Sequence, residues 1–312
     1  MGRKEKAKER REKRVQEIAE KRKIPYSDQQ RWWGSETIAV VTGANRGIGY
    51  EITRQLAGHG LNVILTSRNI NNCHEASKAL QEEGLKVTVH QLDISDPMSI
   101  EVFAEWIRQN YGGIDILVNN AGVNFNIGSD NSVEFAEKVI EINYFGTKRM
   151  IKTMIPLMRS SAFGSRIVNV SSRLGRLNGR RNRIGDVILR DQLSDDNTLS
   201  EELIDRTVTN FLEEVKLGNW TSGVWPQMFT DYSISKLAVN CYTRLTKTLS
   251  ESQDGPGICI NCYCPGWVKT AMTGWAGNSP VEEGADTGVW LALLPGQRVT
   301  GKFFAERREI TF

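Results

Sequence analysis

From residue 37 onward, short apolar runs alternate with segments whose apolar residues recur at helical spacing. The pattern predicts strands at 37–42, 61–67, 86–92, 114–118, 166–170 and 258–264, and helices at 47–58, 73–83, 100–109, near 133–158 and near 232–250. Strands that alternate with helices are typical of βαβ units, whose strands pair in parallel. We therefore expect an α/β fold: a doubly wound (Rossmann) parallel sheet of about seven strands with helices on both faces.

One stretch, at about 175–228, interrupts this alternation. Within it, residues 199–216 carry apolar positions at helical spacing, with Ser200 and Glu202 near the start. A serine just before such a run is a frequent helix N-cap. We expect a helical insertion that packs over the body of the domain.

The first 36 residues differ from the rest in composition. Residues 1–23 hold eleven Lys or Arg and five Glu, a net charge of +6, whereas the whole chain carries +3, so the remainder carries −3. We expect residues 1–36 to form a charged basic extension and connector, with Trp32 and Trp33 docked on a domain at 37–312. The extension is interpreted as a solvated helix or a disordered segment, and as an alternative it could bind nucleic acid, an acidic membrane surface or another acidic partner.

Composition argues against several classes of protein. No apolar run approaches the ~20 residues that span a bilayer, and the N-terminus lacks the apolar region of a secretory signal; both favour a cytoplasmic location. Cys259 and Cys262 lie three apart in an expected strand, so their thiols point to opposite faces. No second Cys/His pair accompanies them, and we therefore expect no metal.

A glycine-rich segment follows the first expected strand and opens the first helix. Such a turn lets the backbone approach a pyrophosphate, and the helix N-terminus favours an anion. At the end of the second strand, where an acidic residue would select NAD, the chain has Arg68; Arg68 and Arg46 suit the 2′-phosphate of NADPH. The expected cofactor contacts in this segment are Gly43, Asn45, Arg46, Gly47, Ile48 and Gly49.

Tyr232 and Lys236 lie four residues apart at the start of an expected helix, so they share one face. A nearby ammonium, together with the positive nicotinamide of an oxidised cofactor, favours the phenolate, and we expect the pKa of Tyr232 to be lowered so that it exchanges protons near neutral pH.

These motifs occur in a fixed order with Asn119-Asn120-Ala121-Gly122, Asn143, Ser171-Ser172 and Pro265-Gly266-Trp267-Val268. The whole set resembles the short-chain dehydrogenase/reductase family over about residues 36–312. Within it, the long segment before the tyrosine and the Cys-Pro-Gly-Trp-Val run are similar to the animal carbonyl reductases and the plant menthone/salutaridine reductase group.

The resemblance implies roles for further residues. Ser172 would hydrogen-bond the substrate carbonyl, Tyr232 would donate the proton, and Asn143 would hold a water that links Lys236 to solvent. Lys236 would also bind the nicotinamide ribose, and Trp267 would line the substrate pocket. Further cofactor contacts would come from Asp93, Ile94, Asn120, Val268 and Thr270.

The substrate side is expected to be apolar. Aromatic and methionine residues flank Tyr232 or follow the cofactor loops. An arginine-rich run at 173–183 has no evident role in this pattern; it is either a solvated face or a site for an acidic substrate or partner. The residues expected around the pocket, with Trp267, are Val123, Asn124, Phe125, Trp225, Pro226, Met228, Phe229, Met272 and Trp275.

The motifs and the resemblance thus predict an NADPH-dependent enzyme that reduces the carbonyl group of a small apolar ketone or aldehyde to an alcohol. The resemblance also implies that the insertion covers the surface through which many family members dimerise, so we expect a monomer. Two alternatives stay open. One is reduction of a conjugated C=C bond in an enone, which the presence of Tyr232 disfavours. The other is a cofactor-bound scaffold that acts through its basic N-terminal tail.

Overall fold

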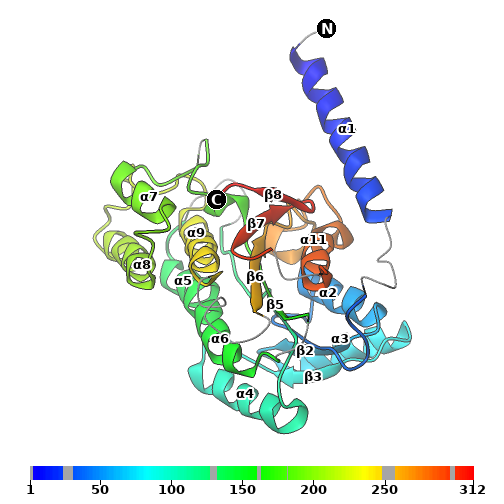
Figure 1. The fold of residues 1–312 in the computed structure, drawn as a ribbon. Helices are drawn as coiled ribbons and strands as arrows, with labels where there is room; N and C mark the ends of the chain where they lie inside the picture. The colour runs from blue at the N-terminus through cyan, green and yellow to red at the C-terminus, as the bar shows by residue number, and fades with distance from the viewer. Residues whose placement is uncertain are drawn as a thin grey trace.

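A computed structural model describes residues 3–23, 31–126, 132–159, 163–180, 182–247, 257–295 and 299–312. Its centre is an eight-stranded sheet in the order β3-β2-β1-β4-β5-β6-β7-β8 (Figure 1). Neighbouring strands are parallel except β7 and β8, which are antiparallel. The strands are β1 Ile38–Val41, β2 Asn62–Ser67, β3 Thr88–Gln91, β4 Ile116–Asn119, β5 Ser165–Val170, β6 Ile258–Tyr263, β7 Lys302–Ala305 and β8 Arg308–Ile310.

The expected fold class is confirmed, with one strand more than the seven anticipated. The additional pairing is the β7–β8 hairpin, whose turn residues Glu306 and Arg307 both have positive φ, at 55° and 53°. Such a two-residue turn usually contains Asn or Gly. Here two contacts of Arg307 offset the cost of its positive φ. Its side chain pairs with Asp286 at 2.6 Å, and its backbone N–H donates to Thr287 Oγ1.

Helices cover both faces of the sheet. One layer holds α2 Gly47–Gly58, α3 Ile70–Glu82 and α11 Val281–Leu293; the other holds α4 Pro97–Tyr111, α5 Ala136–Ile140, α6 Thr147–Met154 and α9 Thr230–Leu245. Strand β1 shows how the two cores are separated: Ile38 and Val40 join one core while Ala39 and Val41 join the other. Side chains of a strand alternate between faces, so a fully apolar strand can serve both.

The segment before Tyr232 folds into two helices, α7 Val187–Ser194 and α8 Glu201–Lys216. The expected helix at 199–216 is α8, and Ser200 caps it by accepting a hydrogen bond from Leu203 N at 3.1 Å. Its apolar side joins the core beside α5 and α9. Lys148 on α6 pairs with Asp205 at 2.6 Å and Glu201 at 3.0 Å, which fixes α8 against the body.

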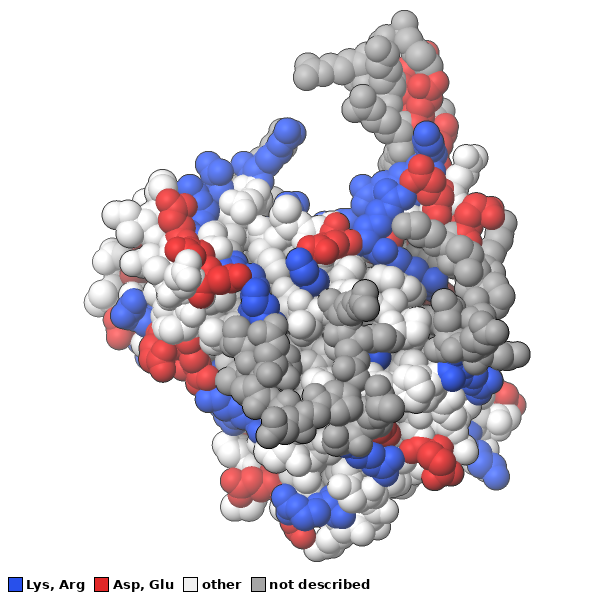
Figure 2. Space-filling model, viewed as in Figure 1, with Lys and Arg blue, Asp and Glu red and all other residues white. Residues whose placement is uncertain are grey.

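The N-terminal residues form the helix α1, Arg3–Lys23, which extends from the body (Figure 1). Arg14 pairs with Glu306, and Glu17 pairs with Arg308, so α1 meets the β7–β8 hairpin. Figure 2 shows basic and acidic side chains intermixed around α1 and over this face of the molecule. Within the described ranges, no helix is both long enough and apolar enough to cross a membrane.

The connector docks on the body as expected. Trp33 is buried, and Trp32 Nε1 donates to Leu293 O at 3.2 Å while its ring stacks on Phe163. The Arg166 guanidinium lies over the Trp32 ring at 4.8 Å.

Candidate active site

The predicted site residues follow the carboxyl ends of neighbouring parallel strands. Because these ends meet at one edge of the sheet, the loops after β1, β4, β5 and β6 lie together there. The chain order changes direction between β1 and β4, and ligands of open α/β sheets bind at such a point.

The glycine loop after β1 is held close to its neighbours. Gly43 and Gly47 have φ of 61° and 60°, which glycine adopts without steric cost. A Cβ on Gly43 would lie 2.8 Å from Ala121 Cα, and one on Gly49 would lie 2.3 Å from Asn120 Nδ2. Arg46, the residue before α2, makes no side-chain cap to the helix, so the first amides of α2 are left for a ligand. The loop therefore fits a pyrophosphate.

Asn120 braces this loop. Its Nδ2 donates to the Thr42 and Gly43 carbonyls at 2.9 and 3.0 Å, and its backbone N–H donates to Thr42 Oγ1 at 3.0 Å. Ala121 N donates to the same hydroxyl. The side-chain amide thus contacts the cofactor loop itself, which ties the ends of β1 and β4 together.

Two cations lie where an adenosine phosphate would be expected. Arg46 and Arg68 are exposed, and in the described part of the chain neither forms an ion pair. Ala44 N donates to Thr66 O at 2.8 Å, which brings the glycine loop against the end of β2, where Arg68 follows.

The remaining predicted cofactor contacts surround the same edge. Asp93 follows β3 and accepts hydrogen bonds from Ser95, and Ile94 is buried. Val268 and Thr270 follow β6; Thr270 approaches the glycine loop, since a Cβ on Gly47 would lie 3.5 Å from its methyl group.

Asn143 lies in a π-helical turn, η1 Glu141–Gly146, and is fully buried. Its Oδ1 accepts from Val123 N at 2.8 Å, and its Nδ2 donates to Val123 O and Ser235 Oγ. Such single π turns often occur at functional sites. A Cβ on Gly122 would lie 3.1 Å from Asn143 Oδ1 and 3.6 Å from Lys236 Nζ, so glycine here lets both side chains approach.

Ser172, Tyr232 and Lys236 come together at the end of β5. The Ser172 hydroxyl lies close enough to the Tyr232 phenol to act on its pKa. Lys236 Nζ donates to Val170 O at 2.9 Å and lies 5.7 Å from the centre of the Tyr232 ring. Ser172 precedes Tyr232 by sixty residues in sequence, yet its side chain lies with those of Tyr232 and Lys236.

The pKa of Tyr232 is raised, not lowered as the sequence suggested. Burial is the largest cause and the nearby Cys264 adds to it, while the bond from Ser172 acts in the opposite direction. Burial also lowers the pKa of Lys236 to about 8. Removing water penalises the charged form of each group, and this outweighs the mutual attraction that the sequence argument relied on. The phenol is therefore protonated at neutral pH.

Comparisons with known proteins agree with this geometry. A family model described as short chain dehydrogenase matches residues 37–183. (+)-Neomenthol dehydrogenase of Arabidopsis thaliana is 39% identical over 88% of this chain and 97% of its own length. Carbonyl reductase [NADPH] 1 of Mus musculus is 38% identical over 84% and 92%. Salutaridine reductase of Papaver somniferum matches in structure with a TM-score of 0.77, 35% identity and coverage of 86% and 99%.

The chain belongs to the short-chain dehydrogenase family. It is accordingly an oxidoreductase that acts on CH–OH or C=O groups and uses a nicotinamide cofactor.

Apolar side chains of this short-chain dehydrogenase lie exposed after β6. Trp267 is 45% exposed, with its indole N–H bonded to Ala276 O, and Met272 and Trp275 are also exposed. Trp225, by contrast, was expected in the pocket and lies in the core: it packs on Phe211 and donates to Glu214 at 2.8 Å. Trp225 is buried because it lies against α8 within the insertion.

The arginine-rich run of the dehydrogenase is partly explained by the C-terminal hairpin. Arg173 pairs with Glu306 at 3.6 Å, and Arg176 donates to Thr311. Arg180 and Arg183 are exposed, and Arg181 lies outside the described residues. The run therefore holds the C-terminus against the turn that follows Ser172.

Two buried residues of the dehydrogenase escaped sequence reasoning. Asn126 Nδ2 donates to Asp231 at 2.7 Å, and Asn182 donates to Ser233 Oγ at 3.0 Å. Their partners Asp231 and Ser233 directly flank Tyr232 in sequence, and this proximity was the one feature of the sequence that could have pointed to these bonds. Both bonds attach loops to the start of α9.

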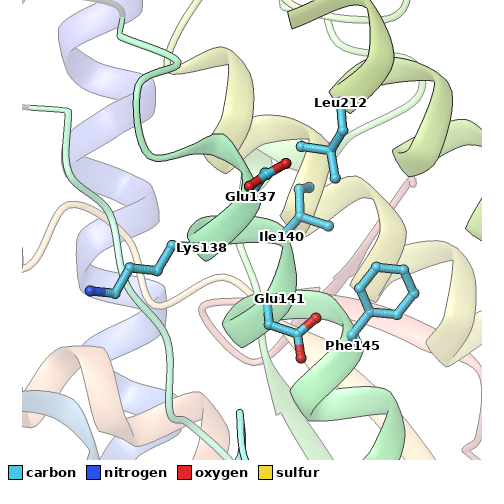
Figure 3. A pocket seen from close by; sticks show the side chains of 6 residues that line it. All are labelled: Glu137, Lys138, Ile140, Glu141, Phe145 and Leu212. Carbon is cyan, nitrogen blue, oxygen red and sulfur yellow. The ribbon is translucent and has the colours of Figure 1, made fainter. Parts of the chain in front are cut away.

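A pocket of about 380 Å³ lies elsewhere, away from these residues (Figure 3). It is bounded by α5, η1 and α8, on the helical layer rather than at the strand ends, and none of the predicted site residues lines it. Its lining residues are Glu137, Lys138, Ile140, Glu141, Phe145 and Leu212.

Proposed function

We propose that this enzyme reduces the carbonyl group of a small apolar ketone or aldehyde to an alcohol, with NADPH as the reductant. The observation that carries the proposal is the convergence of the Ser172 and Tyr232 side chains with Lys236 beside them. Relatives at 38–39% identity bear the names carbonyl reductase [NADPH] 1 and (+)-neomenthol dehydrogenase, which supports the reaction class.

NADPH is preferred over NADH for an electrostatic reason. Arg46 and Arg68 are exposed cations, free of carboxylate partners in the described residues, beside the glycine loop. A 2′-phosphate offers them charge-assisted hydrogen bonds that a 2′-hydroxyl cannot. The loop Gly43–Gly49 and the N-terminus of α2 would hold the pyrophosphate, and Val268 and Thr270 would lie at the nicotinamide end.

Bound NADPH supplies the hydride; the protein supplies orientation and the proton. Ser172 donates a hydrogen bond to the substrate oxygen and stabilises the negative charge that develops on it. Tyr232 donates its phenolic proton to the same oxygen. Its raised pKa suits this direction of reaction, because the phenol must be protonated before it can act as an acid.

Lys236 and Asn143 support the proton donor. The Lys236 ammonium lies beside the Tyr232 ring and stabilises the phenolate left after proton transfer. Asn143 fixes Val123 and Ser235 around this centre, and we propose that a water near it relays a proton to Lys236. Trp267, exposed at the edge of the site, would cover an apolar substrate and exclude water.

The enzyme is proposed to be a monomer. Helix α8 packs against α5 and α9, and the Lys148–Asp205 contact holds it there, so these helices are not available as a subunit interface. Size-exclusion chromatography with light scattering would give a mass near the 35.1 kDa of one chain. A dimer or tetramer in that measurement contradicts the proposal.

The function is tested by NADPH oxidation against a panel of aldehydes, monoterpene ketones and quinones. We expect turnover with NADPH and a KM for NADPH that rises about tenfold in Arg68→Ala, which corresponds to the loss of one exposed charge-assisted bond. Arg108→Ala, an exposed arginine on α4, is the matched control and should leave that KM unchanged. Absence of turnover with every carbonyl, or a preference for NADH, would refute the proposal.

A further inference from the structure

Asn240 continues the face of α9 that carries Tyr232 and Lys236. The three residues are spaced by four, so they lie along one side of the helix. That side meets the segment from Val170 to Gly175, in which β5 ends and the short helix η3, Arg173–Gly175, begins. Tyr232 contacts Ser172, and Lys236 contacts the carbonyl two residues before it.

The Asn240 side chain bonds this segment on both sides of Ser172. Its Oδ1 accepts from Ser171 Oγ at 2.6 Å, and its Nδ2 donates to Gly175 O at 3.0 Å. Asn240 is 1% exposed and Ser171 is 2% exposed. In such a dry environment both bonds are strong, and losing Asn240 leaves Ser171 Oγ with only its longer bond to Lys236 O, at 3.3 Å.

Ser172 lies in a turn that is closed by a bond from Gly175 N to Ser172 O at 3.1 Å, and Asn182 Nδ2 donates to Leu174 O in the same turn at 3.2 Å. The Ser172 hydroxyl accepts from Leu174 N at 3.1 Å, a bond within the same turn. Gly175 lies directly on α9, since a Cβ there would be 2.4 Å from Leu237 N. The distance between the Ser172 and Tyr232 hydroxyls therefore depends on how this turn is fixed to the helix, and Asn240 is the side chain that bonds both of its ends.

We propose that Asn240 is a positioning residue that sets the Ser172 hydroxyl relative to the Tyr232 hydroxyl. The proposal rests on the proposed function, in which both hydroxyls act on one substrate oxygen. An amide is required because the two bonds need one acceptor and one donor. Aspartate keeps the acceptor and loses the donor, and alanine loses both.

The test is a double-mutant cycle on kcat with saturating NADPH and carbonyl substrate. Asn240→Ala should lower kcat by about ten- to a hundredfold, the effect expected of misplacing a reacting group by up to an ångström, with the dissociation constant of NADPH within about twofold of wild type. In a Ser172→Ala background the same change should lower kcat less than about twofold, because the group it positions is gone. Equal loss in both backgrounds, or an unchanged kcat, overturns the proposal.

Asn261→Ala is the matched control. Asn261 is also buried, and its amide also joins two groups, in this case the backbone groups Val299 O and Lys302 N, which lie away from Ser172. It should destabilise the protein similarly and leave kcat unchanged. If Asn240→Ala does not fold, Asn240→Asp enters the same cycle with the same expectations. Failure of the proposed function has a different signature: the wild-type enzyme itself would show no turnover with any carbonyl substrate, or Ser172→Ala would be as active as wild type.

Discussion

Gly49→Ala tests whether the loop after β1 must keep its present shape. The new Cβ would lie 2.3 Å from Asn120 Nδ2 and 2.7 Å from Gly43 O, and these two atoms belong to the bond that braces the loop. Gly49 does not have a positive φ, so the cost is steric. Overpacking costs about 1–3 kcal/mol and the lost hydrogen bond about 1 kcal/mol. We expect a loss of about 2–4 kcal/mol in the free energy of unfolding.

If the loop shifts to make room for the new Cβ, the backbone amides that would hold the pyrophosphate shift with it. A loss of about 1.4 kcal/mol in binding corresponds to a tenfold change, so the dissociation constant of NADPH should rise about tenfold or more. Titration of NADPH fluorescence measures it, and urea denaturation measures the stability. Gly58→Ala is the control on the same helix: nothing lies within 4 Å of its Cβ, and alanine favours the helix by up to about 1 kcal/mol. Wild-type affinity in Gly49→Ala would refute the reasoning.

Three further outcomes are expected. The pKa of Lys236 is lowered to about 8, so kcat/KM for NADPH, which reports the free enzyme, should fall as pH rises through that value; a flat profile up to pH about 9.5 would count against a role for the ammonium. Between this pKa and the ordinary lysine value near ~10.4 the unfolded chain binds more protons, so this group's contribution to the free energy of unfolding rises with pH. Lys148→Met should lower the free energy of unfolding, measured by urea denaturation, by about 1–3 kcal/mol, because Asp205 and Glu201 lose the partly buried ammonium that they share. Lys216→Met removes an exposed ion pair and should cause no resolvable change. Equal effects of the two changes would argue against α8 being fixed by the Lys148 cluster. Trp267→Ala should raise KM for the carbonyl substrate and leave the dissociation constant of NADPH unchanged, and an unchanged KM would remove Trp267 from the pocket.

Sequence patterns sufficed for the βαβ core and for the residues at its edge. A fully apolar strand followed by glycines and a helix is compatible with few folds other than a βαβ unit. Parallel strands then bring their carboxyl ends together whatever the loops contain. For this reason residues that directly follow predicted parallel strands, such as Gly43 and Ser172, are expected at one edge of the sheet from the sequence alone.

The remainder depended on tertiary contacts that no local pattern records. The β7–β8 turn uses Glu306 and Arg307 with positive φ, and its support comes from Asp286 on α11. Trp225 was predicted to line the pocket because it precedes Tyr232 in sequence, but it packs against Phe211 on α8 and is buried in the core. The direction of the pKa shift of Tyr232 depends on burial, which neighbouring residues in sequence do not determine.

The most direct measurement compares kcat in Tyr232→Phe and Tyr242→Phe. Both changes remove a phenolic hydroxyl from α9, and the Tyr242 hydroxyl has no hydrogen-bond partner among the described residues. If Tyr232 is the proton donor, its loss should lower kcat by about 10²–10⁴-fold with NADPH still bound, while Tyr242→Phe stays within about twofold of wild type. A Tyr232→Phe enzyme that reduces carbonyls at the wild-type rate would contradict the account.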